Sequence, residues 1–290
     1  MHWIVVLSLV AGSTLGCSSG GVASAGPGLR VVSLHDVMTE LLVAMDAADR
    51  LVGVDEPVDV SAEVTAALTR VPRVGDLESI LAVRPALVIG LHITAAKDPE
   101  LVARLRQAGI EVYLADPRTL DDVLSMIRAV GARIGAAAAG DQLASRLQSA
   151  ATAIAPAPWS SGQPMGTSEQ TAPTRVFVYD CCDPPFTAGG SSVLGDLIAR
   201  AGGVNVFADV AEAWTHVSWE QVVERRPELV VINAYAFAGQ GDAADKQRAV
   251  RAISALATLP TVVIPLRDSL GGIHSVEGLA LLRAAIRSRI

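Results

Sequence analysis

An Ala-rich stretch near the middle of the chain, residues 136–154, most constrains what this sequence can fold into. Its apolar side chains recur at helical spacing, at Leu143, Leu147, Ala150, Ala151 and Ile154. The spacing predicts one straight helix, about 28 Å long at a rise of about 1.5 Å per residue. A helix of that length matches the width of a small lobe, so it is suited to connect two lobes.

Two similar segments flank the predicted helix. In each, a Glu precedes a short amphipathic helix, a Pro stops the helix, and an apolar, β-branched run follows as a strand. The first segment contains Glu78 and Pro85, the second Glu220 and Pro227, and the Glu-to-Pro spacing is the same in both. An internal repeat of this kind predicts two similar lobes.

Strands alternate with helices along the rest of the chain, a pattern typical of parallel sheets that bind ligands at the carboxyl ends of their strands. We therefore predict an α/β fold with two Rossmann-like lobes, each with a parallel central sheet, joined by a single long backbone helix and with a ligand cleft between them. The predicted parts, in order, are a lipoprotein-type signal (1–17), a flexible tether (18–27), an N-terminal lobe (28–118), a closing helix and the connecting helix (119–155), a flexible loop (156–174) and a C-terminal lobe (175–290).

Composition limits the partners. The chain has 290 residues and is 51% hydrophobic, which is enough apolar material for two cores. A net charge of −7 and the lack of a basic stripe argue against a nucleic-acid partner. No apolar run beyond the N-terminus is long and charge-free enough to span a membrane. We expect a monomer.

The N-terminus resembles a bacterial lipoprotein signal. An apolar stretch, residues 3–11, is followed by Cys17 and a Ser/Gly-rich segment. Acylation of Cys17 would anchor the chain to a membrane. The prediction is therefore an exported, membrane-anchored lipoprotein in the periplasm or on the outer face of the plasma membrane. An unlipidated secretory signal or a buried strand is the alternative, because no Lys or Arg precedes the apolar stretch and Thr14 stands where such signals favour Leu.

Two motifs in the second half carry a family resemblance. They are Pro-Pro-Phe-Thr at residues 184–187 and Ala-Gly-Gly-Val-Asn-Val-Phe at residues 201–207. With both repeat segments, they make the chain resemble the helical-backbone class of ABC-importer substrate-binding proteins over nearly all of the mature sequence. The resemblance implies a binding protein and not an enzyme, with no catalytic cofactor. The implied ligand is a cobalt- or iron-containing chelate: cobalamin or another corrinoid first, a ferric siderophore or haem next.

The resemblance also implies roles for individual residues. Glu78 and Glu220 match the family's docking glutamates, one on each lobe, which meet the membrane permease that works with its ATPase. Trp214 stands where the family places a ligand-contacting Trp, and Phe186 lies in the Pro-Pro-Phe loop. The alternatives are that both glutamates only begin helices, where the helix dipole favours a carboxylate, and that Phe186 packs into its own lobe.

The histidines depart from the family pattern. His35, His92, His216 and His274 all fall in predicted loops, two in each lobe, where strand ends could bring them together. Neutral imidazole is a common transition-metal ligand, so the four could bind a metal ion directly, or one could bind the metal of a chelate. Four unrelated loop histidines is the third interpretation. The complete set of predicted ligand-binding residues is His35, Asp36, His92, Asp183, Phe186, Trp214, His216 and His274.

Other functions stay open at this point. His35, His92, His216 and Asp183 could hold zinc in a metalloenzyme on the same scaffold, although HExxH and GxSxG motifs are missing. The lobes could also serve a sensor instead of a permease. The adjacent pair at residues 181–182, Cys-Cys, would form a vicinal disulfide or stay reduced as soft metal ligands, and we assign it no role.

Overall fold

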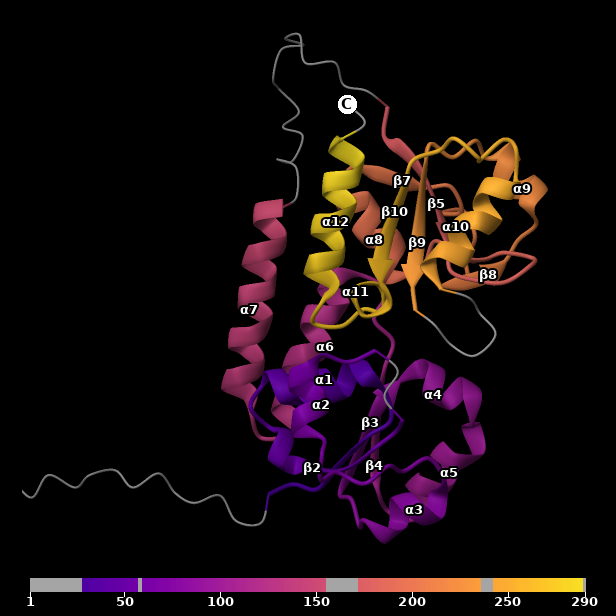
Figure 1. Cartoon of the computed structure of the whole chain (residues 1–290). Helices are drawn as coiled ribbons and strands as arrows, with labels where there is room; N and C mark the ends of the chain where they lie inside the picture. Colours follow the sequence, from indigo (N-terminus) through magenta and orange to yellow (C-terminus); the bar gives the residue numbers. More distant parts are fainter. Residues whose placement is uncertain (1–27, 57–58, 155–171, 236–241, 289–290) are drawn as a thin grey trace, which may run out of the picture.

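The computed structural model describes residues 28–56, 59–154, 172–235 and 242–288 and has two α/β lobes (Figure 1). The first lobe contains a parallel sheet in the order β2-β1-β3-β4, and the second a parallel sheet in the order β10-β9-β5-β7. Their bounds are β1 Val31–Ser33, β2 Leu51–Val54, β3 Leu87–Leu91, β4 Glu111–Ala115, β5 Thr174–Tyr179, β7 Gly203–Asn205, β9 Leu229–Ala234 and β10 Thr261–Pro265. The predicted two-lobed α/β fold is confirmed.

The helices of the first lobe begin at polar caps that the sequence supplies. Asp76 and Thr119 each accept a backbone hydrogen bond in a capping box, and Asp98 caps a helix that has Pro99 in its first position. These helices are α1 Asp36–Ala44, α2 Ala62–Ala67, α3 Leu77–Ala82, α4 His92–Lys97, α5 Pro99–Gln107 and α6 Leu120–Arg133, with a 3-10 turn, Ala48–Arg50, before β2.

The second lobe carries a small additional sheet. Its strands, β6 Phe186–Ala188 and β8 Trp214–His216, pair antiparallel directly after the carboxyl end of β5. The helices of this lobe are α8 Val193–Arg200, α9 Trp219–Glu224, α10 Ala243–Ala252, α11 Leu266–Ser269 and α12 Ser275–Arg287.

The predicted connecting helix is α7, Ala137–Ile154. It lies along α6 of the first lobe and α12 of the second (Figure 1). The α6–α7 contact depends on two glycines: a Cβ on Gly131 would lie 3.0 Å from Cα of Gly140. Small residues at this crossing let the two helix backbones approach closely.

One hydrophobic core runs through both lobes, and each lobe has a smaller core of its own. The shared core takes one face of both sheets, as shown by Val31, Leu87, Val176 and Val231, together with α1, α6, α7, α8 and α12. The alternate strand residues face the opposite way, into a cluster under α3 and α5 in the first lobe and another under α9 and α10 in the second.

The carboxyl ends of the two main sheets are turned toward each other. Arg267, just after β10, donates its backbone N–H to Asp59 of the first lobe at 3.1 Å. A Cβ on Gly272 would lie 3.2 Å from the side chain of Val37, near the carboxyl end of β1. Segments that follow strands of both sheets therefore lie against the opposite lobe, the arrangement in which α/β sheets bind ligands.

Candidate functional site

Three aromatic rings gather on one face of the small β6–β8 sheet. Phe186 is paired with His216 and Ala188 with Trp214, so the side chains of residues 186, 214 and 216 share a face. The Phe186 ring stacks on Trp214 with centroids 5.8 Å apart, and lies 4.8 Å from the His216 ring. We call these three residues the aromatic cluster. Phe186 and Trp214 are half-buried and His216 is exposed.

The loop before β6 is fixed by hydrogen bonds. The backbone N–H of Phe186 donates to the carbonyl of Cys181 at 2.8 Å, and the Tyr179 hydroxyl donates to the carbonyl of Cys182 at 3.0 Å. Cys181 and Cys182 form a vicinal disulfide, one of the two states left open by the sequence. Asp183, predicted to bind ligand, follows the disulfide and is exposed.

A buried polar group lies at the carboxyl ends of β5 and β9. Asp180 accepts hydrogen bonds from the Asn233 amide at 2.6 Å and the Tyr235 hydroxyl at 2.5 Å. The Nζ of Lys246 donates to the backbone carbonyl of Asn233 at 2.8 Å and lies 3.4 Å from the centroid of the Tyr235 ring. Burial lowers the pKa of Lys246, and burial together with Asp180 raises that of Tyr235, which keeps this phenol neutral. The group was not predicted, because its members come from segments far apart in the sequence, the ends of β5 and β9 and helix α10.

His35 and Asp36 are occupied inside the first lobe. His35 is the N-cap of α1, and its Nδ1 accepts the backbone N–H of Val37 at 3.2 Å. Burial lowers the pKa of His35 to about 4, so the ring is neutral at neutral pH. A carboxylate oxygen of Asp36 accepts the backbone N–H of Asp59 at 3.0 Å. Both residues thus stabilise the strand-to-helix connection of this lobe.

His274 contacts the opposite lobe. Its Nε2 lies 3.3 Å from Oε2 of Glu40, which is only 3% exposed and accepts the backbone N–H of Ser61 through its other oxygen. Arg267 and Asp59 form a second charged pair across the same boundary at 3.5 Å. We call these four residues, Glu40, Asp59, Arg267 and His274, the interlobe bridge.

The predicted shared metal centre is wrong. Within residues 28–56, 59–154, 172–235 and 242–288, no group of three or more His, Cys, Asp or Glu side chains could hold a metal ion. The four histidines therefore do not form a direct metal-ion site, and His35, His92 and His216 do not form a zinc site with Asp183. The loop assignment also fails for two of them: His92 begins α4 and His216 ends β8. The physical reason is that two of the rings are already engaged: His35 caps α1 through Nδ1, and Nε2 of His274 faces the carboxylate of Glu40.

The two predicted docking helices, α3 and α9, have the same construction. Each begins at a polar N-cap with a reciprocal capping box, Asp76 with Ser79 and Ser218 with Gln221. Glu78 and Glu220 then occupy the second helical position and are exposed. A hydrogen bond from Ser218 lowers the pKa of Glu220. Both carboxylates therefore project from a fixed helix N-terminus.

The other end of each docking helix is held by an arginine from the first strand region of its lobe. Arg30 donates to the carbonyls of Val83 and Arg84, at 2.7 and 3.1 Å. Arg175 donates in the same way to the carbonyls of Arg225 and Arg226. The receiving residues adopt matching left-handed conformations, with φ of 44° at Arg84 and 47° at Arg226. Sequence reasoning missed both contacts, although aligning the repeats from Arg30 and Arg175 onward would have paired them.

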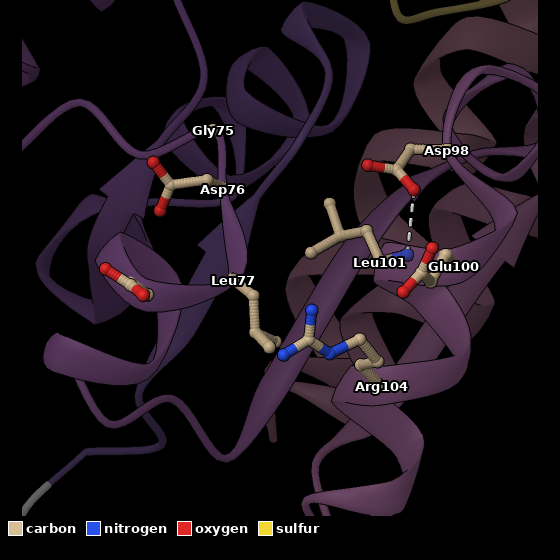
Figure 2. A pocket seen from close by; sticks show the side chains of 8 residues that line it. Gly75, Asp76, Leu77, Asp98, Glu100, Leu101 and Arg104 are labelled. Atoms are coloured by element: carbon tan, nitrogen blue, oxygen red, sulfur yellow. Dashed lines mark hydrogen bonds between the residues drawn. The ribbon is translucent and has the colours of Figure 1, made fainter.

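A polar pocket lies beside Glu78 between α3 and α5. In Figure 2 the side chain of Arg104 extends from α5 toward Leu77, and the carboxylates of Asp76 and Glu100 lie on opposite sides of the opening. Asp98 uses one oxygen to cap α5 through the N–H of Leu101 at 2.8 Å. The complete lining is Gly75, Asp76, Leu77, Glu78, Asp98, Glu100, Leu101 and Arg104, with more carboxylates than guanidinium groups.

Two facing parallel sheets, a long helix packed against both lobes and an aromatic cluster at a strand end define a two-lobed substrate-binding protein. A sequence profile described as "Periplasmic binding protein" matches residues 31–262. The chain belongs to this family and is a binding protein, not an enzyme. No helix among the described residues has the length and apolar character that crossing a membrane requires.

Known relatives agree with this assignment. The vitamin B12-binding protein of Vibrio cholerae is 29% identical over 242 residues, 81% of each chain, and that of Vibrio parahaemolyticus 28% identical over 214 residues, 73% of each. The periplasmic heme-binding protein of Roseiflexus sp. RS-1 is 25% identical, with a TM-score of 0.69 over 90% of this chain and 98% of the other. A periplasmic binding protein from Veillonella parvula has the same fold, at 18% identity and a TM-score of 0.75 over 90% and 92% of the two chains.

Proposed function

We propose that this periplasmic binding protein captures a planar metal chelate, a corrinoid first and haem next, between its lobes and delivers it to an ABC permease. The observation that carries the proposal is the aromatic cluster on the β6–β8 sheet, directly after the carboxyl end of β5, the end at which such sheets bind ligands. Aromatic faces bury a large flat area with little loss of rotamer entropy, which suits a macrocycle. A ferric siderophore is the third candidate ligand.

The names of the relatives favour this order of ligands. Relatives at 28–29% identity are named for vitamin B12, and a solved structure at 25% identity is named for heme. Corrinoids and haem are both planar tetrapyrrole chelates with a central metal ion. The aromatic cluster is compatible with either, because stacking depends on the macrocycle and not on the metal.

Calorimetric titration with cyanocobalamin tests the ligand class. We expect binding at or below micromolar affinity for the chain that begins at Ser18, and a loss of roughly tenfold in Trp214→Ala and in Phe186→Ala. Tyr113→Leu, which removes a half-buried aromatic ring from β4 of the first lobe, should bind like the unmodified chain. Absence of binding to cyanocobalamin with binding of hemin would move the ligand to haem, and absence of both would reject a planar chelate and leave the ferric siderophore.

We further propose that Glu78 and Glu220 dock the protein onto arginines of the permease. Their support is the matching position of both carboxylates at exposed helix N-termini, one on each lobe. Glu78→Arg and Glu220→Arg should each abolish uptake while calorimetric affinity stays unchanged. Glu63→Arg is the matched control, since Glu63 is an exposed carboxylate in the first turn of α2. Normal uptake by both docking variants would exclude this role.

Membrane attachment is the remaining part of the proposal. Cys17 lies outside the residues that the structure describes, and its support is the signal-like sequence before it. Cys17→Ser should release the exported protein, which we take to act as a monomer, from the membrane fraction without changing its affinity for the chelate. Membrane association of this variant equal to that of the unmodified protein would contradict lipidation.

A further inference from the structure

One nitrogen of the His216 ring has a hydrogen-bond partner in its own lobe. Nδ1 lies 3.2 Å from the carbonyl oxygen of Pro184. Because a carbonyl oxygen can only accept a hydrogen bond, Nδ1 must carry the hydrogen. In the neutral ring this leaves Nε2 with a free lone pair, on a side chain that is exposed.

The backbone around His216 is fixed as well. The N–H of Val217 donates to the carbonyl of Pro185 at 2.9 Å, so adjacent carbonyls of one loop hold both the His216 ring and the next peptide. The opposite strand places Phe186 4.8 Å from the imidazole, and Phe186 in turn stacks on Trp214. The direction of the Nε2 lone pair is thereby set relative to the aromatic cluster.

The other histidines do not share this arrangement. In His35 the nitrogen Nδ1 accepts a hydrogen bond, so Nε2 carries the hydrogen. In His274, Nε2 faces the carboxylate of Glu40. Among the described residues, no hydrogen-bond partner orients the exposed ring of His92. His216 alone of the four combines a free Nε2 with a donor contact from Nδ1 to a carbonyl, which is the usual second contact of metal-binding imidazoles.

We infer that Nε2 of His216 coordinates the central metal of the bound chelate, an inference that rests on the proposed function. Because imidazole binds a metal in the plane of its ring, the macrocycle would lie at the Nε2 edge of His216, beside Phe186 and Trp214. With aquocobalamin, the Nε2–cobalt bond forms and the cobalt–water bond breaks. The water leaves, cobalt keeps its oxidation state, and Nδ1 keeps its hydrogen bond to Pro184.

Absorption spectra of two probes, aquocobalamin and hemin, test this inference. We expect at least one probe to shift to the spectrum of its imidazole-ligated form on binding to the unmodified chain. His216→Ala and His216→Gln should both lose the shift. Their affinity for that probe should fall at least roughly tenfold, because removing even an outer-shell partner of a metal ligand typically costs roughly 10- to 100-fold. If aquocobalamin is the probe that shifts, the affinity for cyanocobalamin should change much less, because cyanide occupies the coordination position. Circular dichroism confirms that both variants are folded.

The outcomes separate the inference from the proposed function. Binding of aquocobalamin or hemin with no spectral shift, or a shift that survives in both His216 variants, would overturn the coordination by His216 and leave chelate binding intact. A shift lost in His92→Ala but kept in His216→Ala would overturn it in the same way. If neither aquocobalamin nor hemin binds to the unmodified chain, both the inference and the proposed ligand class fall.

Discussion

His274 and Glu40 face each other across the boundary between the lobes, with Nε2 of the first 3.3 Å from Oε2 of the second. Glu40 is almost fully buried in α1, and His274 directly precedes α12. With the nearby Arg267–Asp59 pair, this contact ties the loops of the second lobe to the helix that follows β1. The interlobe bridge therefore holds the two lobes together partly through charged side chains.

The bridge predicts a stability change near neutral pH. A hydrogen bond to Glu40 raises the pKa of His274, and Glu277 acts in the same direction while burial and Arg267 oppose it. Because the folded pKa is raised, the stabilisation is complete below the unfolded pKa of about 6.5 and is lost as pH rises through the folded pKa. His274→Gln should lower the unfolding free energy by about 1–2 kcal/mol at pH 6 and less at pH 8.

Urea denaturation at both pH values measures this difference. The neighbouring Asp268, whose pKa burial raises to about 6, is present in both chains, but His274 is one of the cations that lower this pKa, so the Asp268 pKa rises further in His274→Gln. Glu40→Gln should remove the same pH-dependent difference, because it removes the other half of the contact. Equal losses for His274→Gln at pH 6 and pH 8 would contradict the bridge.

His35 predicts the opposite behaviour in acid. Burial lowers its pKa to about 4, against opposition from Asp36 and with a small contribution from Lys97. The stabilisation from the neutral ring is therefore complete above about pH 6.5 and is lost as pH falls toward 4. Asn is a favoured N-cap, so His35→Asn should keep the start of α1 and resist acid better than the unmodified chain. Denaturation midpoints at pH 7, 5.5 and 4.5 check this, and an unchanged fall in midpoint would refute it.

Arg30 and Arg175 hold the carboxyl ends of α3 and α9, so replacing either should affect its own helix only. Each variant is therefore a control for the other. Arg30→Met removes the donors to the two carbonyls that directly follow α3, and Arg175→Met removes the donors to the two that directly follow α9. Each change should speed amide exchange in its own helix roughly fivefold, since a net hydrogen bond is worth about 1 kcal/mol, and leave the other helix unchanged. Hydrogen exchange by mass spectrometry resolves the two helices. Equal protection of both helices in both variants would show that the arginines do not hold them.

Gly131 lies where α6 and α7 cross, and the space there is too small for a larger residue. In Gly131→Ala the new Cβ would lie 3.0 Å from Cα of Gly140 and 3.1 Å from the carbonyl oxygen of Ala136, both backbone atoms that cannot rotate away. We expect a loss of about 1–3 kcal/mol in unfolding free energy, measured in urea, despite the better helix propensity of Ala. Gly75→Ala is the control, because nothing lies within 4 Å of its added Cβ. A gain in stability for Gly131→Ala would mean that the helices are not in close contact.

Long periodic or repeated features could be predicted from the sequence. The helix at 137–154 follows from its apolar spacing, and the matching positions of Glu78 and Glu220 follow from the repeat. The β6–β8 sheet could not be predicted, because three residues per strand carry no periodicity and the pairing joins Phe186 to His216 across thirty residues of sequence.

The histidines show a second limit. Whether a ring nitrogen is free depends on a distant partner, such as Glu40 for His274, or on a local cap, such as the Val37 N–H for His35. Neither partner is visible from residue type alone. The prediction that all four histidines face a ligand therefore grouped residues with different roles. His35 caps a helix, His274 contacts the opposite lobe, and His92 and His216 are exposed.

The apolar core that continues from β1 through α6, α7 and α12 to β5 has a consequence for how the protein folds and unfolds. Neither half of the chain can cover that surface with its own residues, so an isolated half would expose the apolar side of α6 or of α12 to water. The two halves should therefore melt together in one cooperative transition, even though each contains a complete sheet. Two lobes in outline make a single folding unit in thermodynamic terms.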